Sequence, residues 1–263
     1  MGKPLPSLVD RAAEEEEGAV DPPPTRPTCP ACARPLPACL CAHCPPHPHP
    51  LAGRVIILQH PHEARRPKAT APLVGRCVAP VTVLVGRTFH GTAARPVPPA
   101  LAAALADASA GVAPLYILWP DDPAAVAVEE AAAGGAGRPY TLLALDGTWR
   151  QAREMWGAAA GGWLGGAPGV TVVRTAGAST AALSSPPAGA GALFVEPAGG
   201  VCVSTAEAVA AGLATLEPAG SPGPPALASA VRGMAEVAAQ FDPAVAARLG
   251  WVEAWGRGVE ERG

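Results

Sequence analysis

The sequence predicts an α/β fold in which a mostly parallel sheet carries helices on both faces, with a small cysteine-rich module before it. Three observations support this prediction. Short apolar runs rich in β-branched residues alternate with Ala-rich stretches that favour helices. The length of 263 residues suits one large domain with a small appendage. Five of the seven cysteines fall within residues 29–44, outside the alternating region.

The predicted strands are continuous apolar runs, the pattern typical of parallel strands that are buried on both faces. Five clear runs cover residues 54–60, 81–86, 113–119, 140–146 and 170–175, and "LFVEP" at 193–197 is a shorter candidate. Helix-compatible stretches separate them at about 98–109, 123–133 and 149–160, and a further helix is predicted over 204–217. The main domain is therefore expected to span residues 51–220.

The two ends of the chain are expected to lie outside this sheet. Residues 1–28 predict a disordered leader, because they are acidic, rich in Pro and without periodicity. Residues 29–50 hold the cysteine cluster and a stiff Pro/His spacer. The Pro-rich segment 221–225 breaks the chain, and the segment 221–263 is expected to form two helices, near 226–240 and 243–256, that pack on the domain.

Charge and hydropathy exclude some classes of protein. The net charge of −3 gives no global basic field for nucleic acid, although cations gather early in the main domain, at Arg54, Arg65, Arg66, Lys68, Arg76 and Arg87. No run of about 18 apolar residues is present, and the N-terminus does not resemble a secretory signal. We expect a cytoplasmic protein without a membrane partner, whose thiols stay reduced.

The cysteine cluster "CPACARPLPACLCAHC" predicts a structural zinc site. A reducing compartment favours metal over disulfides at this density, and Zn²⁺ prefers four thiolate or imidazole ligands. Cys29 and Cys32 with Cys39 and Cys41 form a plausible four-thiolate set, and Cys44 can replace Cys41. The alternative is a set of incidental cysteines in a flexible leader. Cys77 and Cys202 stand among apolar residues and are expected to be small core residues.

The segment "LQHPHEARRPKAT" at 58–70 follows the first predicted strand. In open α/β sheets ligands bind at the carboxyl ends of the strands, so this loop is a candidate binding loop with cations that can face phosphates. A metal site at His60, His62 and Glu63 is a weaker interpretation, because no helical ligand spacing or further ligand accompanies them. A solvated loop without a ligand is the third interpretation.

Two motifs stand where strands are expected to give way to helices. Thr148 with Gln151, and Ser204 with Glu207, have the spacing of a capping box, which explains both hydroxyls without any function. Helix capping does not explain Asp146. Burial at the end of an apolar strand would raise the pKa of its carboxyl and make it a better general base.

The segment "LDGTWRQAREM" resembles the signature of the DTW-domain family, the tRNA-uridine aminocarboxypropyltransferases. Three further features occur in the expected order: the cysteine cluster, "LQHPHEARRPKAT" and "STAEA", so the resemblance covers about residues 29–217. It implies a SPOUT-like catalytic domain with a C-terminal knot. It also implies a transferase of the EC 2.5.1 type, which moves the 3-amino-3-carboxypropyl group of S-adenosylmethionine to N3 of a uridine in tRNA and releases methylthioadenosine.

The resemblance also implies roles for individual residues. Asp146 is the candidate catalytic base. The co-substrate is expected to contact Trp119, Pro120, Leu145, Thr148, Trp149, Ser204 and Thr205. Contacts to RNA are expected from His60, Glu63, Arg65, Arg66, Lys68, Arg150 and Arg153. The chain departs from the family where a Tyr and an Arg are common, because "STAALSSPP" at 179–187 has Ala181 and Ser184 in those places.

Two other functions stay open at this point. One is a SPOUT RNA methyltransferase, and the other is a zinc-containing RNA-binding protein that has lost catalysis, which the departure at Ala181 and Ser184 would suit. The sequence does not determine the modified uridine, the tRNA species, or whether the protein is a monomer or a homodimer.

Overall fold

The structure is a computed structural model of the chain. It describes residues 27–32, 34–66, 69–91, 96–133, 135–160, 163–175, 194–195, 201–202 and 204–241. The leader up to residue 26, Lys68, the segment 179–187 and the expected helix 243–256 lie outside the described residues. Across the described ranges, no helix combines the length and the apolar character that a membrane crossing requires.

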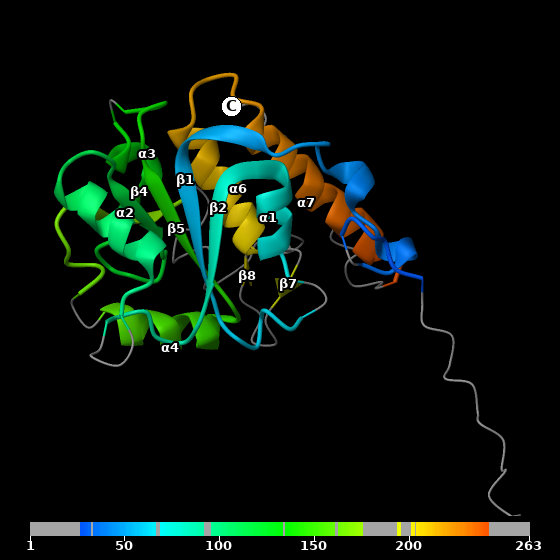
Figure 1. Cartoon of the computed structure of the whole chain (residues 1–263), viewed down its shortest axis with the longest axis horizontal. Coiled ribbons are helices and arrows are strands. Elements are labelled where there is room, and N and C mark those ends of the chain that lie inside the picture. Colours follow the sequence, from blue (N-terminus) through cyan, green and yellow to red (C-terminus); the bar gives the residue numbers. More distant parts are fainter. Residues whose placement is uncertain are drawn as a thin grey trace, which may run out of the picture.

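A parallel sheet forms the centre of the molecule (Figure 1). Within the described residues it has six strands in the order β2-β1-β5-β3-β6-β4, and each neighbouring pair is parallel. Their bounds are β1 His49–Gln59, β2 Val78–Val85, β3 Leu115–Leu118, β4 Val126–Ala127, β5 Thr141–Asp146 and β6 Val170–Arg174. The mostly parallel sheet predicted from the continuous apolar runs is confirmed.

Helices lie on both faces of this sheet, as predicted. Their bounds are α1 Ala71–Cys77, α2 Pro99–Ser109, α3 Val128–Ala131, α4 Trp149–Ala160, α6 Thr205–Leu216 and α7 Gly223–Ala239. Two 3-10 helices, η1 Leu36–Ala38 and η2 Cys41–His43, precede the sheet, and a short antiparallel pair joins β7 Phe194–Val195 to β8 Val201–Cys202.

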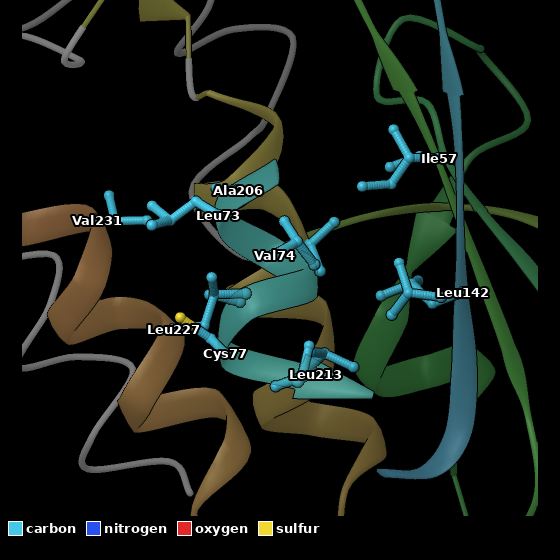
Figure 2. Close-up of a cluster of buried hydrophobic side chains, with 14 of the residues drawn as sticks. Ile57, Leu73, Val74, Cys77, Leu142, Ala206, Leu213, Leu227 and Val231 are labelled. Atoms are coloured by element: carbon cyan, nitrogen blue, oxygen red, sulfur yellow. The ribbon is translucent and has the colours of Figure 1, made fainter. Parts of the chain in front are cut away.

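Alternate residues of each central strand enter two separate cores. In β1, Val55 and Ile57 pack in the first core with α1, α6 and α7, whereas Ile56 and Leu58 pack in the second core with α2 and α4. Figure 2 shows the first core, where Ile57 and Leu142 of the sheet face the helices. The first core also holds Cys77, which is fully buried as predicted. Burial on both faces explains why these strands are continuously apolar.

The chain leaves β1 and β5 toward opposite faces. After β1 it enters α1, whose Val74 lies in the first core, and after β5 it enters α4, whose Met155 lies in the second core. β1 and β5 are neighbours, with Gln59 paired to Asp146 at their carboxyl ends. In open α/β sheets the usual ligand crevice lies outside the strand ends at a divergence of this kind, so the region outside the ends of β1 and β5, called the crevice below, is the candidate ligand site.

Two elements differ from the prediction. The helix expected over 123–133 is wrong, because residues 126–127 form β4 and only Val128–Ala131 is helical. Asp122 accepts a hydrogen bond from the Ala124 amide, which makes a turn, and Val126 then pairs with Val173 of β6. Pairing at the sheet edge therefore overrides the helix propensity of an Ala-rich stretch. Helix α1 lies in a segment for which no helix was predicted.

A buried carboxylate fixes the start of α7 at the amino ends of the strands. Glu217 accepts hydrogen bonds from the Tyr140 hydroxyl and the Ala52 amide, and the Ser221 hydroxyl lies 3.2 Å from its Oε2. Burial and the adjacent Glu217 raise the pKa of Tyr140 well above its ordinary range. This network connects β1, the residue before β5 and the turn before α7, so it anchors the start of α7 to the sheet.

Candidate active site and metal centre

Asp146 lies in the crevice between β1 and β5, and its side chain is held by two donors. Its residue is 3% exposed. Gln59 donates from Nε2 to Asp146 Oδ2 at 2.7 Å, and Thr205 donates from its hydroxyl to Oδ1 at 2.5 Å. The structure thus brings together three segments that are far apart in the sequence. Each carboxylate oxygen keeps a second lone pair that can accept a proton.

The environment of Asp146 favours its neutral form more than water does. Burial raises the pKa of Asp146, and the hydrogen bonds from Thr205 and Gln59, with the positive charge of Arg66, oppose the rise. Burial also raises the pKa of the nearby Glu63 carboxyl, with a further contribution from Asp146. A carboxylate with a raised pKa is a stronger base than one in water, so it is better suited to accept a proton.

The capping box predicted at the start of α4 is confirmed. Thr148 receives a hydrogen bond at its Oγ1 from the Gln151 amide, and its own amide donates to Gln151 Oε1. Gly147 sits between this box and the loop after β1, since a Cβ there would lie 3.1 Å from Gln151 Cβ and 3.3 Å from His60 Cβ. The cap therefore fixes the backbone immediately after Asp146.

The capping box predicted at the start of α6 is confirmed too, and it changes what that helix end can bind. The Ser204 amide donates to Glu207 Oε2, and the Glu207 amide donates to the Ser204 hydroxyl. The Ser204 amide is therefore engaged, and the inner amides of Thr205 and Ala206 take no part in the box. Glu207 is fully buried, and this burial raises its pKa to about 7.

Three tryptophans from the segment after β3 and from α4 form an aromatic cluster. The Trp119 ring lies 5.6 Å from the Trp149 ring and 5.7 Å from the Trp156 ring, between centroids. Trp119 directly follows β3 and is 4% exposed, whereas Trp149 is half-buried and packs against the second core. Pro120 is half-buried next to Trp119, and Leu145 packs on the second core. Trp149 thus packs on the core and stays partly exposed, near Asp146 in the chain.

The loop after β1 lies directly against the end of β5. The His60 amide donates to the Asp146 carbonyl, and the Glu63 amide donates to the His60 carbonyl. His60 is 1% exposed, and its Nδ1 accepts a hydrogen bond from the His62 amide. Burial lowers the pKa of His60, which favours the neutral ring, and the bond accepted at Nδ1 leaves the proton of that neutral ring on Nε2. Among the described residues that buried Nε2 has no partner.

The arginines expected to contact RNA lie in the loop after β1 and in the first turns of α4. Arg65, Arg66, Arg150 and Arg153 are exposed. Arg153 forms an ion pair with Asp121 at 2.9 Å and lies 5.7 Å from the Trp149 ring centroid. His60 is buried and Glu63 is half-buried, so both are less exposed than these arginines.

Four cysteines form a cluster with the geometry of a metal site. Sulfur atoms of Cys29, Cys32, Cys39 and Cys41 all lie within 4.8 Å of one another. The Cys29–Cys41 and Cys32–Cys39 sulfur distances are 3.7 and 3.8 Å. A regular ZnS₄ tetrahedron with bonds of about 2.3 Å has edges of about 3.8 Å. The donor set therefore fits zinc.

Cys44 belongs to a different environment from these four. It packs against the first core, where the Cys77 thiol and Arg76 lower its pKa to about 6. The alternative in which Cys44 replaces Cys41 is therefore disfavoured, because its side chain is engaged beside Cys77 and is absent from the described four-sulfur group.

The cysteine module packs against the main domain beside α7 (Figure 1) and is held there by several contacts. Arg76 of α1 donates to the Ala31 carbonyl at 2.8 Å and to Cys41 Sγ at 3.5 Å. Leu40 is 1% exposed and belongs to the first core. His43 packs against α7 at Gly233, where a Cβ would lie 2.1 Å from His43 Cγ. The module is thus part of the folded domain rather than a separate appendage.

A Gly233→Ala variant is expected to lose stability even though alanine is the better helix former by about 1 kcal/mol. The added methyl group overlaps the His43 ring, so η2 must move away from α7. The matched control is Gly157→Ala in α4, where nothing lies within 4 Å of the new Cβ. Thermal denaturation should show a rise of roughly 2–4 °C for the control and a fall for Gly233→Ala. Equal rises would show that His43 does not pack on α7.

Sequence reasoning missed two residues of these sites. Gln59 ends β1 as a polar residue after an apolar run, the same signal that singled out Asp146, yet it was assigned no role. Arg76 was noticed only as one of several cations. The sequence contains no signal that pairs Arg76 with Cys41, since the contact crosses 35 positions.

Comparison with known proteins identifies the family. Residues 26–184 match the DTW domain. The chain is 30% identical over 165 residues to tRNA-uridine aminocarboxypropyltransferase 2 of Macaca fascicularis, covering 59% of this chain and 52% of the relative. It is 35% identical over 133 residues to the protein of that name from Mus musculus, covering 50% of this chain and 41% of the relative.

A third relative matches over a longer range. The chain is 30% identical over 222 residues to tRNA-uridine aminocarboxypropyltransferase A of Arabidopsis thaliana, covering 74% of each protein. It spans about half the length of the two mammalian relatives. No solved structure matches the chain. The domain match covers more than half of the sequence, and with the arabidopsis relative it shows that the chain belongs to the DTW domain family.

Proposed function

We propose that this protein is a tRNA-uridine aminocarboxypropyltransferase of the EC 2.5.1 type. It transfers the 3-amino-3-carboxypropyl group of S-adenosylmethionine to N3 of a uridine in tRNA and releases methylthioadenosine. The observation that carries the proposal is the buried Asp146 carboxylate, which Gln59 and Thr205 hold in the crevice between β1 and β5. The names of the relatives support the same activity.

In the proposed reaction Asp146 is the general base. The N3–H proton of uracil passes to the carboxylate as N3 attacks the Cγ carbon next to the sulfonium. The N3–C bond forms, the C–S bond breaks, and the electron pair of that bond stays on sulfur as a neutral thioether. Because the sulfonium is a good leaving group, the protein mainly has to orient N3, Cγ and the base. Thr205 and Gln59 orient the carboxylate.

The residues around the crevice suit the rest of the co-substrate. The half-buried Trp149 with Trp119 offers aromatic faces for adenine, and Pro120 and Leu145 border them. Thr148 keeps a hydroxyl proton after its cap is formed, so it can still donate to the ligand. His60 presents a buried Nε2–H donor that suits a uracil carbonyl, since it has no partner among the described residues.

Exposed cations in two segments suit the phosphates of tRNA. Arg65 and Arg66 lie in the loop after β1, Arg150 and Arg153 lie in α4 with Arg153 beside Trp149, and Lys68 belongs to the loop in sequence. Backbone contacts of this kind position RNA without reading its sequence. The proposal includes a cytoplasmic enzyme with a SPOUT-like fold and a C-terminal knot. The parallel sheet and the return of α6 to the first core support that fold.

We also propose that Cys29, Cys32, Cys39 and Cys41 hold a structural zinc ion. Four thiolates around Zn²⁺ carry a net charge of about −2, which Arg76 offsets through its contact to Cys41. The ion would supply structure and no chemistry, because its ligands lie in a module that packs on α1 and α7, away from Asp146.

The test is a reaction of the purified protein with S-adenosylmethionine and unmodified tRNA, followed by mass spectrometry of nucleosides and of the small products. We expect methylthioadenosine and a uridine heavier by one aminocarboxypropyl group. Release of S-adenosylhomocysteine with a methylated nucleoside would replace the proposal with a methyltransferase. Binding of tRNA without binding of S-adenosylmethionine would indicate an RNA-binding protein that has lost catalysis.

A further inference from the structure

The largely buried carboxylate of Glu63 and the exposed guanidinium of Arg66 lie side by side in the loop after β1. Arg66 Nη1 lies 3.2 Å from Glu63 Oε2, and the side chains are 52% and 13% exposed. Glu63 Oε2 is buried and makes no hydrogen bond within the described residues, although it is ion-paired. The Arg66 amide donates to the Glu63 carbonyl, so a single turn fixes the pair. Both side chains keep hydrogen-bonding capacity for a ligand.

This pair belongs to the same crevice as Asp146. The Glu63 amide donates to the His60 carbonyl, and the His60 amide donates to the Asp146 carbonyl, so the loop is connected to the end of β5. The three charged groups interact electrostatically: Arg66 lowers the pKa of Asp146, and Asp146 contributes to raising the pKa of Glu63. Together Glu63, Arg66 and Asp146 carry a formal charge of −1.

The chemistry of the proposed reaction requires a site for a zwitterion close to the base. The carbon that is attacked lies two bonds from the carbon that bears the α-ammonium and the α-carboxylate. Those two groups must therefore lie within a few ångströms of the uracil N3 and hence of Asp146. S-adenosylmethionine carries a net charge of +1 from its sulfonium, ammonium and carboxylate, which complements the −1 of the described cluster.

We propose that Glu63 binds the α-ammonium and Arg66 the α-carboxylate of the transferred aminocarboxypropyl chain. This inference rests on the proposed function, and it replaces an RNA-binding role for Glu63 and Arg66 with contact to the co-substrate. The transferred chain carries its ammonium and carboxylate into the modified uridine. The pair therefore contacts the co-substrate before transfer and the product afterwards, whereas methylthioadenosine, which has neither group, does not contact it.

Isothermal titration calorimetry with three ligands tests the assignment on the full-length protein. The ligands are S-adenosylmethionine, its decarboxylated analogue and methylthioadenosine. Arg66→Gln is expected to weaken the binding of S-adenosylmethionine about 10- to 100-fold, the range for one hydrogen bond to a charged group. The affinities of the decarboxylated analogue and of methylthioadenosine should change by no more than about twofold, because both ligands lack the carboxylate. Glu63→Gln should weaken the binding of S-adenosylmethionine and of its decarboxylated analogue, which keeps the ammonium. The binding of methylthioadenosine should not change.

Matched substitutions in α3 and in the loop before β5 serve as controls. Arg138→Gln and Glu129→Gln remove the same charges at exposed positions and should bind all three ligands as the native protein does. The assignment is overturned if Arg66→Gln leaves S-adenosylmethionine binding unchanged, or if it weakens methylthioadenosine equally. Failure of the native protein to bind S-adenosylmethionine would instead remove the proposed function, and the assignment with it. The ligand pattern separates these two failures.

Discussion

Replacing Asp146 with asparagine is expected to slow aminocarboxypropyl transfer by about 10²–10⁴-fold, the usual contribution of a general base. Asparagine has the shape of aspartate but cannot accept the N3 proton at neutral pH. Its amide can keep both neighbours, because its oxygen accepts from Gln59 Nε2 and its nitrogen donates to the Thr205 hydroxyl. The loss should therefore fall on the chemical step and leave the binding of S-adenosylmethionine nearly unchanged.

The pH dependence of the native enzyme should reveal the same group. Only the ionised carboxylate can accept a proton, so the rate should rise with pH through the pKa of Asp146 and then level off. Burial raises that pKa, so the rise should lie above the range of an ordinary aspartate. Single-turnover rates across pH, with S-adenosylmethionine and tRNA at saturation, measure this rise. The residual activity of Asp146→Asn should not rise with pH in the same range.

A stability measurement separates a lost base from a damaged fold. In the folded state the pKa of Asp146 is raised above its unfolded value, so ionisation of this group costs stability once the pH exceeds the unfolded value. Asp146→Asn should therefore be at least as stable as the native protein at pH 7. Glu130→Gln removes one exposed negative charge and should keep the full rate. A fully active Asp146→Asn enzyme would exclude Asp146 as the base.

Removal of zinc is expected to destabilise the whole domain and not only residues 29–44. Leu40 is fully buried in the first core, and His43 packs on α7, so loosening of the module opens the main core to water. Exposure of one such leucine costs about 1.5–3 kcal/mol, equivalent to a fall of roughly 3–12 °C in the thermal midpoint. Denaturation curves before and after chelation, with zinc content measured by elemental analysis, test this expectation.

Cysteine variants identify the ligands. Cys32→Ser replaces a soft thiolate with a hydroxyl and should lose zinc and the stability that depends on it. Cys44→Ser is the matched control, because Cys44 lies beside Cys77 rather than in the four-sulfur group. It should keep one zinc ion per chain. Loss of zinc from Cys44→Ser and its retention in Cys41→Ser would contradict the ligand set.

The strength of local signals decided which parts of the fold could be predicted. Strands β1, β2, β3, β5 and β6 were evident because burial on both faces demands unbroken apolar runs. The caps of α4 and α6 were evident because S/T-x-x-E/Q spacing is a local requirement. Residues 126–127 were wrongly predicted as helical, since their pairing with β6 depends on a strand that lies far along the chain.

The sequence by itself determined the parallel sheet, the cysteine cluster as a candidate metal site and Asp146 as the acid that capping leaves unexplained. Only the tertiary structure decided which groups hold that acid. Gln59 lies 87 positions from Asp146, and Thr205 lies 59 positions away. These donors meet only because β1 and β5 are neighbours in the sheet and α6 returns to its face. Local periodicity records which face of an element is buried, but it carries no information on which distant side chain shares a hydrogen bond.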